Sequence, residues 1–214
     1  MKKVLIVAYH FPPSNAVGAL RPAKFAEYLP EYGWEPIVLA GDEEVEGEVQ
    51  FGGLEDMEVQ VVEAWPGLRD VARAISKRVR SLRHGAGRRP TESAHGKGAE
   101  SAWRAEYTES GKRQSVLRNL LYSLMWLPDD RQGWIVPAVC AGTRAVRDAR
   151  PDVILATSPP HSVQVVGLLI AMFTGLPLVA DFRDPWVGNP GTPDFIRAGP
   201  TRRIHDTLEA RVLN

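Results

Sequence analysis

The sequence is poor in the features that mark several large classes of protein. A single cysteine, Cys140, excludes a disulfide within the chain, and this cysteine content is typical of a reducing compartment. The 26 basic and 26 acidic residues leave no net charge, which argues against a protein that must bind nucleic acid. We therefore expect no nucleic-acid partner, although equal totals leave room for local patches of charge.

Long hydrophobic runs are missing as well. The apolar run near the N-terminus covers only residues 4–9, which is too short for the core of a signal peptide. The longest other apolar stretch, residues 165–173, falls well short of the roughly 20 residues needed to cross a bilayer. The sequence therefore predicts a cytoplasmic protein without a membrane-spanning segment.

Familiar motifs for phosphates and metals are also absent. Neither a Gly-X-Gly-X-X-Gly run nor a Walker-type loop follows the first apolar run, which leaves Gly18 as the one candidate for a phosphate-binding turn. Gly18 is equally compatible with a turn of purely structural importance. The five histidines show no ligand spacing and no Asp-X-Asp pair occurs, so no metal site is predicted.

The residues that are present predict an α/β fold. Short aliphatic runs at 3–9, 35–40, 59–62, 153–157 and 178–182 predict strands, and the first, without polar alternation, is typical of a strand buried on both faces of a parallel sheet. Helical patterns at 116–127, 132–147 and 162–174, and a stripe at positions 25, 28, 29 and 32 that Gly33 ends, alternate with them. This order predicts a Rossmann-like open parallel sheet with helices on both faces, which binds ligands at the carboxyl ends of its strands.

Composition divides the chain into four parts. Residues 1–84 form the first part of the predicted domain, and residues 116–200 form the second part of the same domain. Residues 85–115 contain no Val, Leu, Ile, Phe or Met, which indicates a flexible insertion. Residues 201–214 are interpreted as the start of a helix that leads to a further domain.

Three loops that follow predicted strands combine prolines with polar groups, and prolines hold such groups in a fixed geometry. The loops are HFPPSNAVGALRP, TSPPHS and DFRDPW. His161 in the second loop faces either a ligand or solvent, and Asp181, Arg183 and Asp184 in the third form either a ligand site or a pair that stabilises a turn. A Ser158–His161–Asp184 triad is conceivable but disfavoured, because no Gly-X-Ser-X-Gly turn presents the serine.

Three segments together resemble the N-terminal half of a GT-B glycosyltransferase of the family 4-like group. They are VLIVAYHFPPSNAVGALRPAKFAEYLPEYGWEPIVLAGD, PDDRQGW and PDVILATSPPHSVQVVGLLIAMFTGLPLVADFRDPW, and they cover most of the chain outside 85–115. The resemblance implies two Rossmann-like domains across a cleft, the first shaping the acceptor site and the second holding most of the donor. It also implies transfer of a sugar from a nucleotide-diphosphate donor to an acceptor hydroxyl with retention of configuration, without metal or cofactor.

The resemblance also assigns roles to individual residues. The expected catalytic residues are Arg183, Asp184 and His161, with Arg183 standing where many relatives have a histidine. The residues expected at the donor phosphate and sugar are Asn15, Gly18, Ala19 and Arg21, with Ala19 in place of a second glycine. The residues expected to line the cleft or contact the acceptor are His10, Ser158, Asp181 and Trp186.

The chain as given departs from the family pattern because it stops at Asn214, before the second domain. We therefore expect negligible transferase activity from these residues alone. The alternative is a non-catalytic binding or regulatory module that kept the fold. The expected partners are a nucleotide-diphosphate sugar, a glycan or lipid-linked acceptor, and the missing C-terminal domain.

Residues 67–89 carry eight basic residues and one acidic residue. Their apolar positions fall on one helical stripe, at Leu68, Val71, Ala72, Ile75, Val79 and Leu82. Such a helix either lies on anionic lipid headgroups, at the inner face of the membrane, or packs its apolar stripe on the sheet. The sequence leaves both interpretations open.

Overall fold

A computed structural model describes residues 1–42, 57–68, 126–188 and 201–214, together with residues 70, 71, 74, 78 and 124. The strands of this part are β1 (Lys2–Ala8), β2 (Trp34–Gly41), β3 (Val59–Val62), β4 (Val153–Ser158) and β5 (Leu178–Phe182). The α-helices are α1 (Leu20–Tyr28), α5 (Gln132–Ala149), α6 (Ser162–Thr174) and α8 (Arg202–Leu213). Two short 3-10 turns, η1 (Val17–Ala19) and η2 (Leu29–Tyr32), flank α1.

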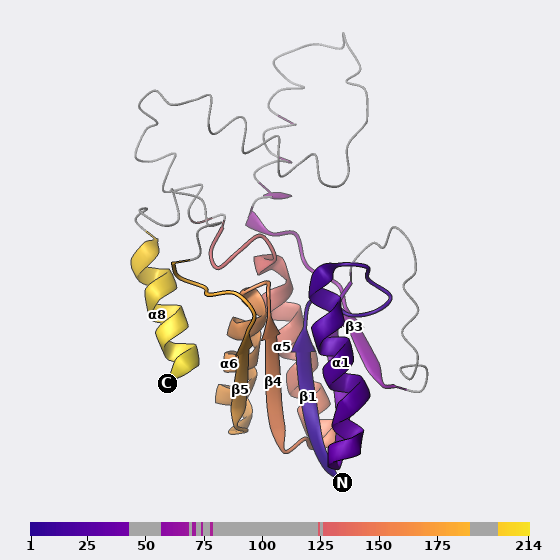
Figure 1. The fold of residues 1–214 in the computed structure, drawn as a ribbon. Helices are drawn as coiled ribbons and strands as arrows, with labels where there is room; N and C mark the ends of the chain where they lie inside the picture. Colours follow the sequence, from indigo (N-terminus) through magenta and orange to yellow (C-terminus); the bar gives the residue numbers. More distant parts are fainter. Residues whose placement is uncertain are drawn as a thin grey trace.

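The five strands form one parallel sheet in the order β3-β2-β1-β4-β5. This confirms the predicted α/β, Rossmann-like fold, and it shows that residues 2–62 and 153–182 contribute strands to the same sheet. The chain runs outward from β1 to β2 and β3, then returns to the other side of β1 to build β4 and β5 (Figure 1). The carboxyl ends of β1 and β4 therefore meet at the point where the strand order reverses, which is where open α/β sheets bind ligands.

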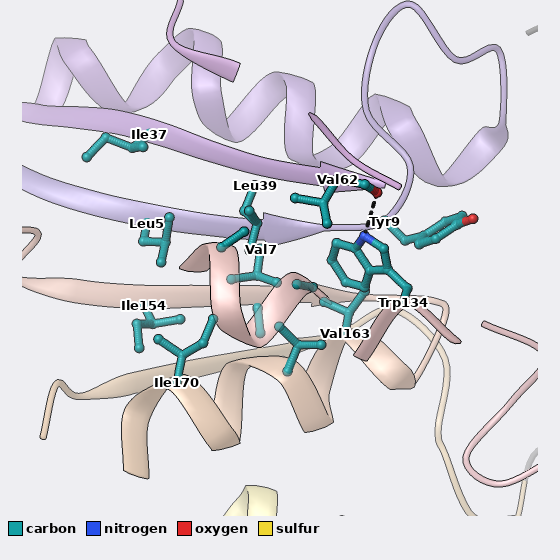
Figure 2. Packing of buried hydrophobic residues seen from close by; sticks show 14 residues of the cluster. Leu5, Val7, Tyr9, Ile37, Leu39, Val62, Trp134, Ile154, Val163 and Ile170 are labelled. Carbon is teal, nitrogen blue, oxygen red and sulfur yellow. Dashed lines mark hydrogen bonds between the residues drawn. The ribbon is translucent and has the colours of Figure 1, made fainter. Parts of the chain in front are cut away.

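Helices cover both faces of the sheet, as predicted. On one face α5 and α6 pack over a core that includes Leu5, Leu39 and Ile154 (Figure 2). On the other face α1 packs over the alternate strand positions, among them Ile6 and Val38. Consecutive residues of β1 are thus buried on opposite faces, which explains why its sequence shows no alternation of polar and apolar residues.

The predicted helix before Gly33 is interrupted by a proline. The α-helical part ends at Tyr28 and continues as the 3-10 turn η2, which has Pro30 in its first turn. Because proline has no N–H group, it cannot donate the next bond of an α-helix. Gly33 closes the turn with a φ of 80°, a conformation that favours glycine, so the predicted stop at this residue is confirmed.

Helix α5 contains a proline without losing its continuity. Pro137 cannot donate to the carbonyl of Gly133, four residues earlier in the helix. That carbonyl instead accepts the backbone N–H of Trp65, at 3.0 Å. The indole N–H of Trp134 in turn donates to the Val62 carbonyl at 3.1 Å, drawn as a dashed line in Figure 2. The segment after β3 and the start of α5 are thereby joined.

Several predictions concern residues outside the described part. The flexible insertion at 85–115 lies there, as do most of the predicted helix at 116–127 and most of the basic segment at 67–89. The expected helix at 201–214 is confirmed as α8, while its continuation into a second domain stays a prediction. Among the described residues, no helix has the length and hydropathy that crossing a bilayer requires.

Candidate functional site

The loops after β1, β4 and β5 lie at one edge of the sheet, because these strands are parallel neighbours. Thr157 is in register with Asp181 and Ser158 with Phe182, so the second and third loops leave the sheet side by side. The strands before the first two loops, β1 and β4, are largely buried, whereas β5 is an edge strand with partly exposed side chains. The predicted site residues therefore come from three separated parts of the sequence to a single edge.

Asp181 lies where the three segments meet. Its Oδ2 atom accepts a hydrogen bond from the Thr157 hydroxyl at 2.7 Å. Its Oδ1 atom lies 2.8 Å from the guanidinium of Arg21, which belongs to the first turn of α1. The Asp181 side chain is 13% exposed and that of Arg21 45% exposed, so the carboxylate is held in place while much of the cation faces solvent. Asp181 thus joins α1 to the ends of β4 and β5.

A buried glutamine connects the ends of β4 and β5. The Gln164 amide nitrogen lies 3.0 Å from the Ala156 carbonyl, 2.9 Å from the Asp181 carbonyl and 3.1 Å from Ser158 Oγ. The Ser158 hydroxyl, itself buried, donates to the Asp181 carbonyl. A serine used in this way is bonded to backbone and is not presented as a nucleophile.

His161 directly precedes α6 and is partly buried. Its ring stacks on that of Trp186, with centroids 5.2 Å apart and planes 3° from parallel. Burial, with a smaller effect of nearby His205, lowers the pKa of His161 from its ordinary 6.5 to about 4, and Asp184 opposes this shift. The imidazole is therefore neutral at pH 7, where it can exchange hydrogen bonds with a hydroxyl group but carries no charge.

Trp186, expected to line the cleft, is 4% exposed and lies between two histidines. One of its faces stacks on His161, and its indole N–H donates to Nδ1 of His205 in α8 at 3.2 Å. Burial also lowers the pKa of His205, against an opposing effect of Asp206. Sequence patterns gave no reason to select His205, because it lies in a mostly polar helix.

Arg183 and Asp184 are half-exposed beside this stack. Their side chains approach each other to 3.9 Å, a loose ion pair that water reaches from both sides. The Arg183 backbone N–H donates to the Ser158 carbonyl at 3.2 Å, which fixes the start of the loop to β4. Arginine stays protonated in proteins, so Arg183 can neutralise an anion but is a poor proton acceptor.

The loop after β1 is more open. Asn15 is exposed, whereas Ala19 is buried and its N–H donates to the Ala16 carbonyl at 2.9 Å. Gly18 lies against the His10 ring, since a Cβ atom there would meet His10 Cδ2 at 3.0 Å. The structure therefore places His10 and Gly18 in contact and gives Ala19 a role in packing.

A turn that sequence reasoning did not select joins two of the loops. Asp129 accepts the backbone N–H of Ser162 at 2.7 Å and its hydroxyl at 2.6 Å, and also the N–H of Arg131 at 2.8 Å. The Arg131 guanidinium donates to the Tyr9 hydroxyl at 3.0 Å and lies 4.7 Å from the centre of the Tyr9 ring. The turn thereby connects the start of α6 to the end of β1.

Burial raises the pKa of Asp129, and its bonds to Ser162 and Arg131 act in the opposite direction. A carboxylate at the first N–H groups of a helix also interacts favourably with the helix dipole. The signal in the sequence was the segment PDDRQGW, where two acids and an arginine fall within a short turn before a helix. It carried the family resemblance without indicating which neighbour each side chain contacts.

Within the described residues, no three His, Cys, Asp or Glu side chains gather closely enough to hold a metal ion. No protein-family model matches the sequence, and no curated protein is significantly similar to it.

Proposed function

We propose that the chain is the acceptor-side domain of a retaining glycosyltransferase, which transfers a sugar from a nucleotide-diphosphate donor to an acceptor hydroxyl. The observation that carries this proposal is the convergence of the three loops on the edge where the strand order reverses. Arg21 and Arg183 there have half-exposed cationic groups, and the same edge carries the neutral imidazole of His161. A diphosphate with a sugar attached has the matching chemistry, two negative charges and several hydroxyl groups.

The charge that each side chain carries at neutral pH determines the role we propose for it. As the bond between the sugar and the diphosphate breaks, negative charge builds on the leaving oxygen, and the two arginines stabilise it without giving up a proton. Neutral His161 and the carboxylate of Asp184 are suited to bind sugar or acceptor hydroxyls. Helix ends and basic groups thus do the work that a metal does in other transferases, and the proposal includes no cofactor.

The test compares the 214-residue chain with the product of the complete reading frame that contains it. We expect the longer protein to release nucleoside diphosphate from one nucleotide sugar and the 214-residue chain to show negligible turnover. Arg183→Ala in the longer protein is expected to lower kcat/KM by about 100-fold, as loss of a group that stabilises the leaving charge does. Arg147→Ala, an exposed arginine in the last turn of α5, is the matched control.

Saturation-transfer NMR with nucleoside diphosphates and nucleotide sugars separates binding from turnover. Binding without turnover by either protein would instead support the alternative, a non-catalytic module that kept the fold. Absence of both binding and turnover, or unchanged rates for Arg183→Ala, Asp184→Ala and His161→Ala, would contradict the assignment of the site.

We further propose that the segment after β3 contacts an anionic membrane surface at its cytoplasmic side. Leu68 and Val71, two members of the predicted apolar stripe, are 56% and 46% exposed, so these two side chains do not pack on the sheet. Trp65 beside them is exposed too, and tryptophan favours the interface of a bilayer. The basic residues of the same segment have the charge that attracts anionic lipids.

Co-sedimentation with vesicles tests this contact. Binding to phosphatidylserine vesicles at low salt, lost in phosphatidylcholine vesicles and weakened by a Trp65→Ser, Leu68→Ser double variant, is expected. Met172→Ser, Phe173→Ser, which changes two exposed apolar residues of α6, is the control. Absence of binding to anionic vesicles at low salt would contradict the proposed contact with a membrane.

A further inference from the structure

Helix α8 holds the loop after β5 through two hydrogen bonds. His205 Nδ1 accepts the indole N–H of Trp186, and Glu209 Oε1 accepts the backbone N–H of Val187 at 3.1 Å. His205 and Glu209 are four residues apart, so they lie on the same face of the helix. Figure 1 shows α8 alongside α6, at the β5 side of the sheet, and the two helices are in contact. One face of α8 thus binds two consecutive residues of the loop.

The contact extends through Trp186 to the candidate site. Because Trp186 stacks on His161 with nearly parallel rings, a movement of the indole displaces the imidazole as well. Arg183 and Asp184 stand three and two residues before Trp186, so the same movement shifts both charged side chains. The ordered rings of His161, Trp186 and His205 therefore connect α8 to the three residues expected to act on the substrate.

We infer that His205 and Glu209 are positioning residues of the candidate site, and that protonation of His205 releases α8 from the loop after β5. The effect on catalysis rests on the proposed transferase function, whereas the release itself is a property of this chain. Neither residue contacts the expected substrate directly. They act by keeping Trp186, and through it His161, in place.

The hydrogen bond determines where the proton of His205 lies. Since the indole N–H is the donor, Nδ1 must keep its lone pair, and the neutral ring carries its proton on Nε2. The Nε2 atom is buried and has no hydrogen-bond partner among the described residues. A proton added at Nδ1 would place two donors face to face, so the contact with Trp186 cannot survive it.

The charged groups around His205 come from α8 and from the loop after β5. On α8, Asp206 favours the protonated ring and Glu209 is engaged with Val187. On the facing loop, Asp184 favours a protonated His161, whereas His205 disfavours it. Helix α6, which packs against α8, carries no charged residue. The effect of burial on the pKa of His205 is larger than the opposing effect of Asp206. The neutral form of His205 therefore binds Trp186, and acid favours the form in which α8 is released from the loop.

The experiment follows hydrogen exchange by NMR on the 214-residue chain between pH 7.5 and 4.5. The Trp186 indole signal is assigned by its loss in Trp186→Phe, and exchange rates are expressed as protection factors, which remove the intrinsic effect of pH. We expect the protection of this N–H and of the Val187 amide to fall together by at least about tenfold, since a proton on Nδ1 removes the acceptor of the indole N–H.

Three variants separate the proposed cause from general acid unfolding. His205→Asn keeps an acceptor near the position of Nδ1 but does not titrate, so its protection should stay constant with pH. Asp206→Asn removes the charge that favours the protonated ring, so its transition should move to lower pH. Arg203→Ala, an exposed change elsewhere on α8, should behave like the unchanged chain.

A transition that persists in His205→Asn would overturn the inference, and so would protection at Val187 that outlasts the loss at Trp186. In the product of the complete reading frame, His205→Leu is expected to lower kcat by at least about tenfold with little change in KM, and His205→Asn to remove the acid limb of the pH profile. If the NMR transition is found but no transfer is detected, positioning by α8 stands and the transferase proposal fails.

Discussion

The two sides of the candidate site are built differently. On the side of β4 and β5, buried polar groups bind one another: Gln164 joins both strand ends, and Trp186 lies between two histidines. On the side of β1, the loop carries exposed residues such as Asn15, and the half-exposed guanidinium of Arg21 forms an ion pair with Asp181. The first side is a network of buried hydrogen bonds, and the second is an accessible loop with one cation.

This difference predicts that one side of the site contributes mainly to the stability of the fold and the other mainly to ligand binding. A buried polar group that loses its partner costs the free energy of its desolvation, so the β4 and β5 side is fixed before any ligand arrives. A half-exposed ion pair contributes little to folding, because water and salt screen it. We therefore expect substitutions on the first side to lower the free energy of unfolding, and substitutions on the second side to change ligand affinity with the fold intact.

The largest expected loss of stability follows Gln164→Ala. The change removes the donor from two buried carbonyls and leaves a cavity, which together should lower the free energy of unfolding by about 3 kcal/mol. Urea unfolding measures the change. Gln164→Met fills most of the volume without the hydrogen bonds, so it should recover only the cavity part. A loss below about 1 kcal/mol for Gln164→Ala would show that the network is not decisive for the fold.

The next largest expected loss of stability follows Asp129→Ala. Three donors, from Ser162 and Arg131, lose their acceptor, and we expect a loss of about 2 kcal/mol in the free energy of unfolding. Because the same turn reaches Tyr9, the variant should also broaden the NMR signals of the loop after β1. Asp130→Ala, the exposed neighbour, is the control. Equal losses for the two variants would contradict the role given to Asp129.

Acid should lower the free energy of unfolding through His161, on the same side of the site, by a smaller amount. The pKa of His161 is about 4 in the folded chain and 6.5 unfolded, so its contribution is complete above pH 6.5 and is lost as the pH falls toward 4. After allowance for partial exposure, we expect roughly 1.5 kcal/mol over this window. The raised pKa of Asp129 acts in the opposite direction, so the measurement is the difference between the unchanged chain and His161→Gln. A difference independent of pH would contradict burial of a neutral imidazole.

The contrast also explains what the sequence could predict. The aliphatic runs fixed the strands to within about a residue or two, as for β3 and β5, and the order of elements fixed the parallel sheet. The loops at strand ends followed from topology alone. The partners of Asp129 and His205 could not be predicted, because a hydrogen bond between residues 19 or 33 positions apart leaves no periodic pattern. Trp186 lies in a loop at the edge that the topology indicates, and its burial depends on contacts with α8.

The smallest expected effect on stability, and the sharpest test of the contrast, comes from Arg21→Ala. The ion pair with Asp181 is half-exposed on the arginine side, so its loss should cost less than about 1 kcal/mol of unfolding free energy, and Thr157 still holds the carboxylate. Affinity for a nucleoside diphosphate should nevertheless fall by about tenfold or more, since a cation leaves the site.

Lys24→Ala provides a closely matched control for Arg21→Ala. Lys24 lies one turn later in α1, its side chain is 46% exposed against 45% for Arg21, and it also forms an ion pair within the chain, with Glu27. It should change neither stability nor affinity beyond a few tenths of a kcal/mol. If Arg21→Ala destabilised the chain as much as Asp129→Ala, the β1 side would belong to the same fixed network. Both sides of the candidate site would then be held in place by interactions that stabilise the fold.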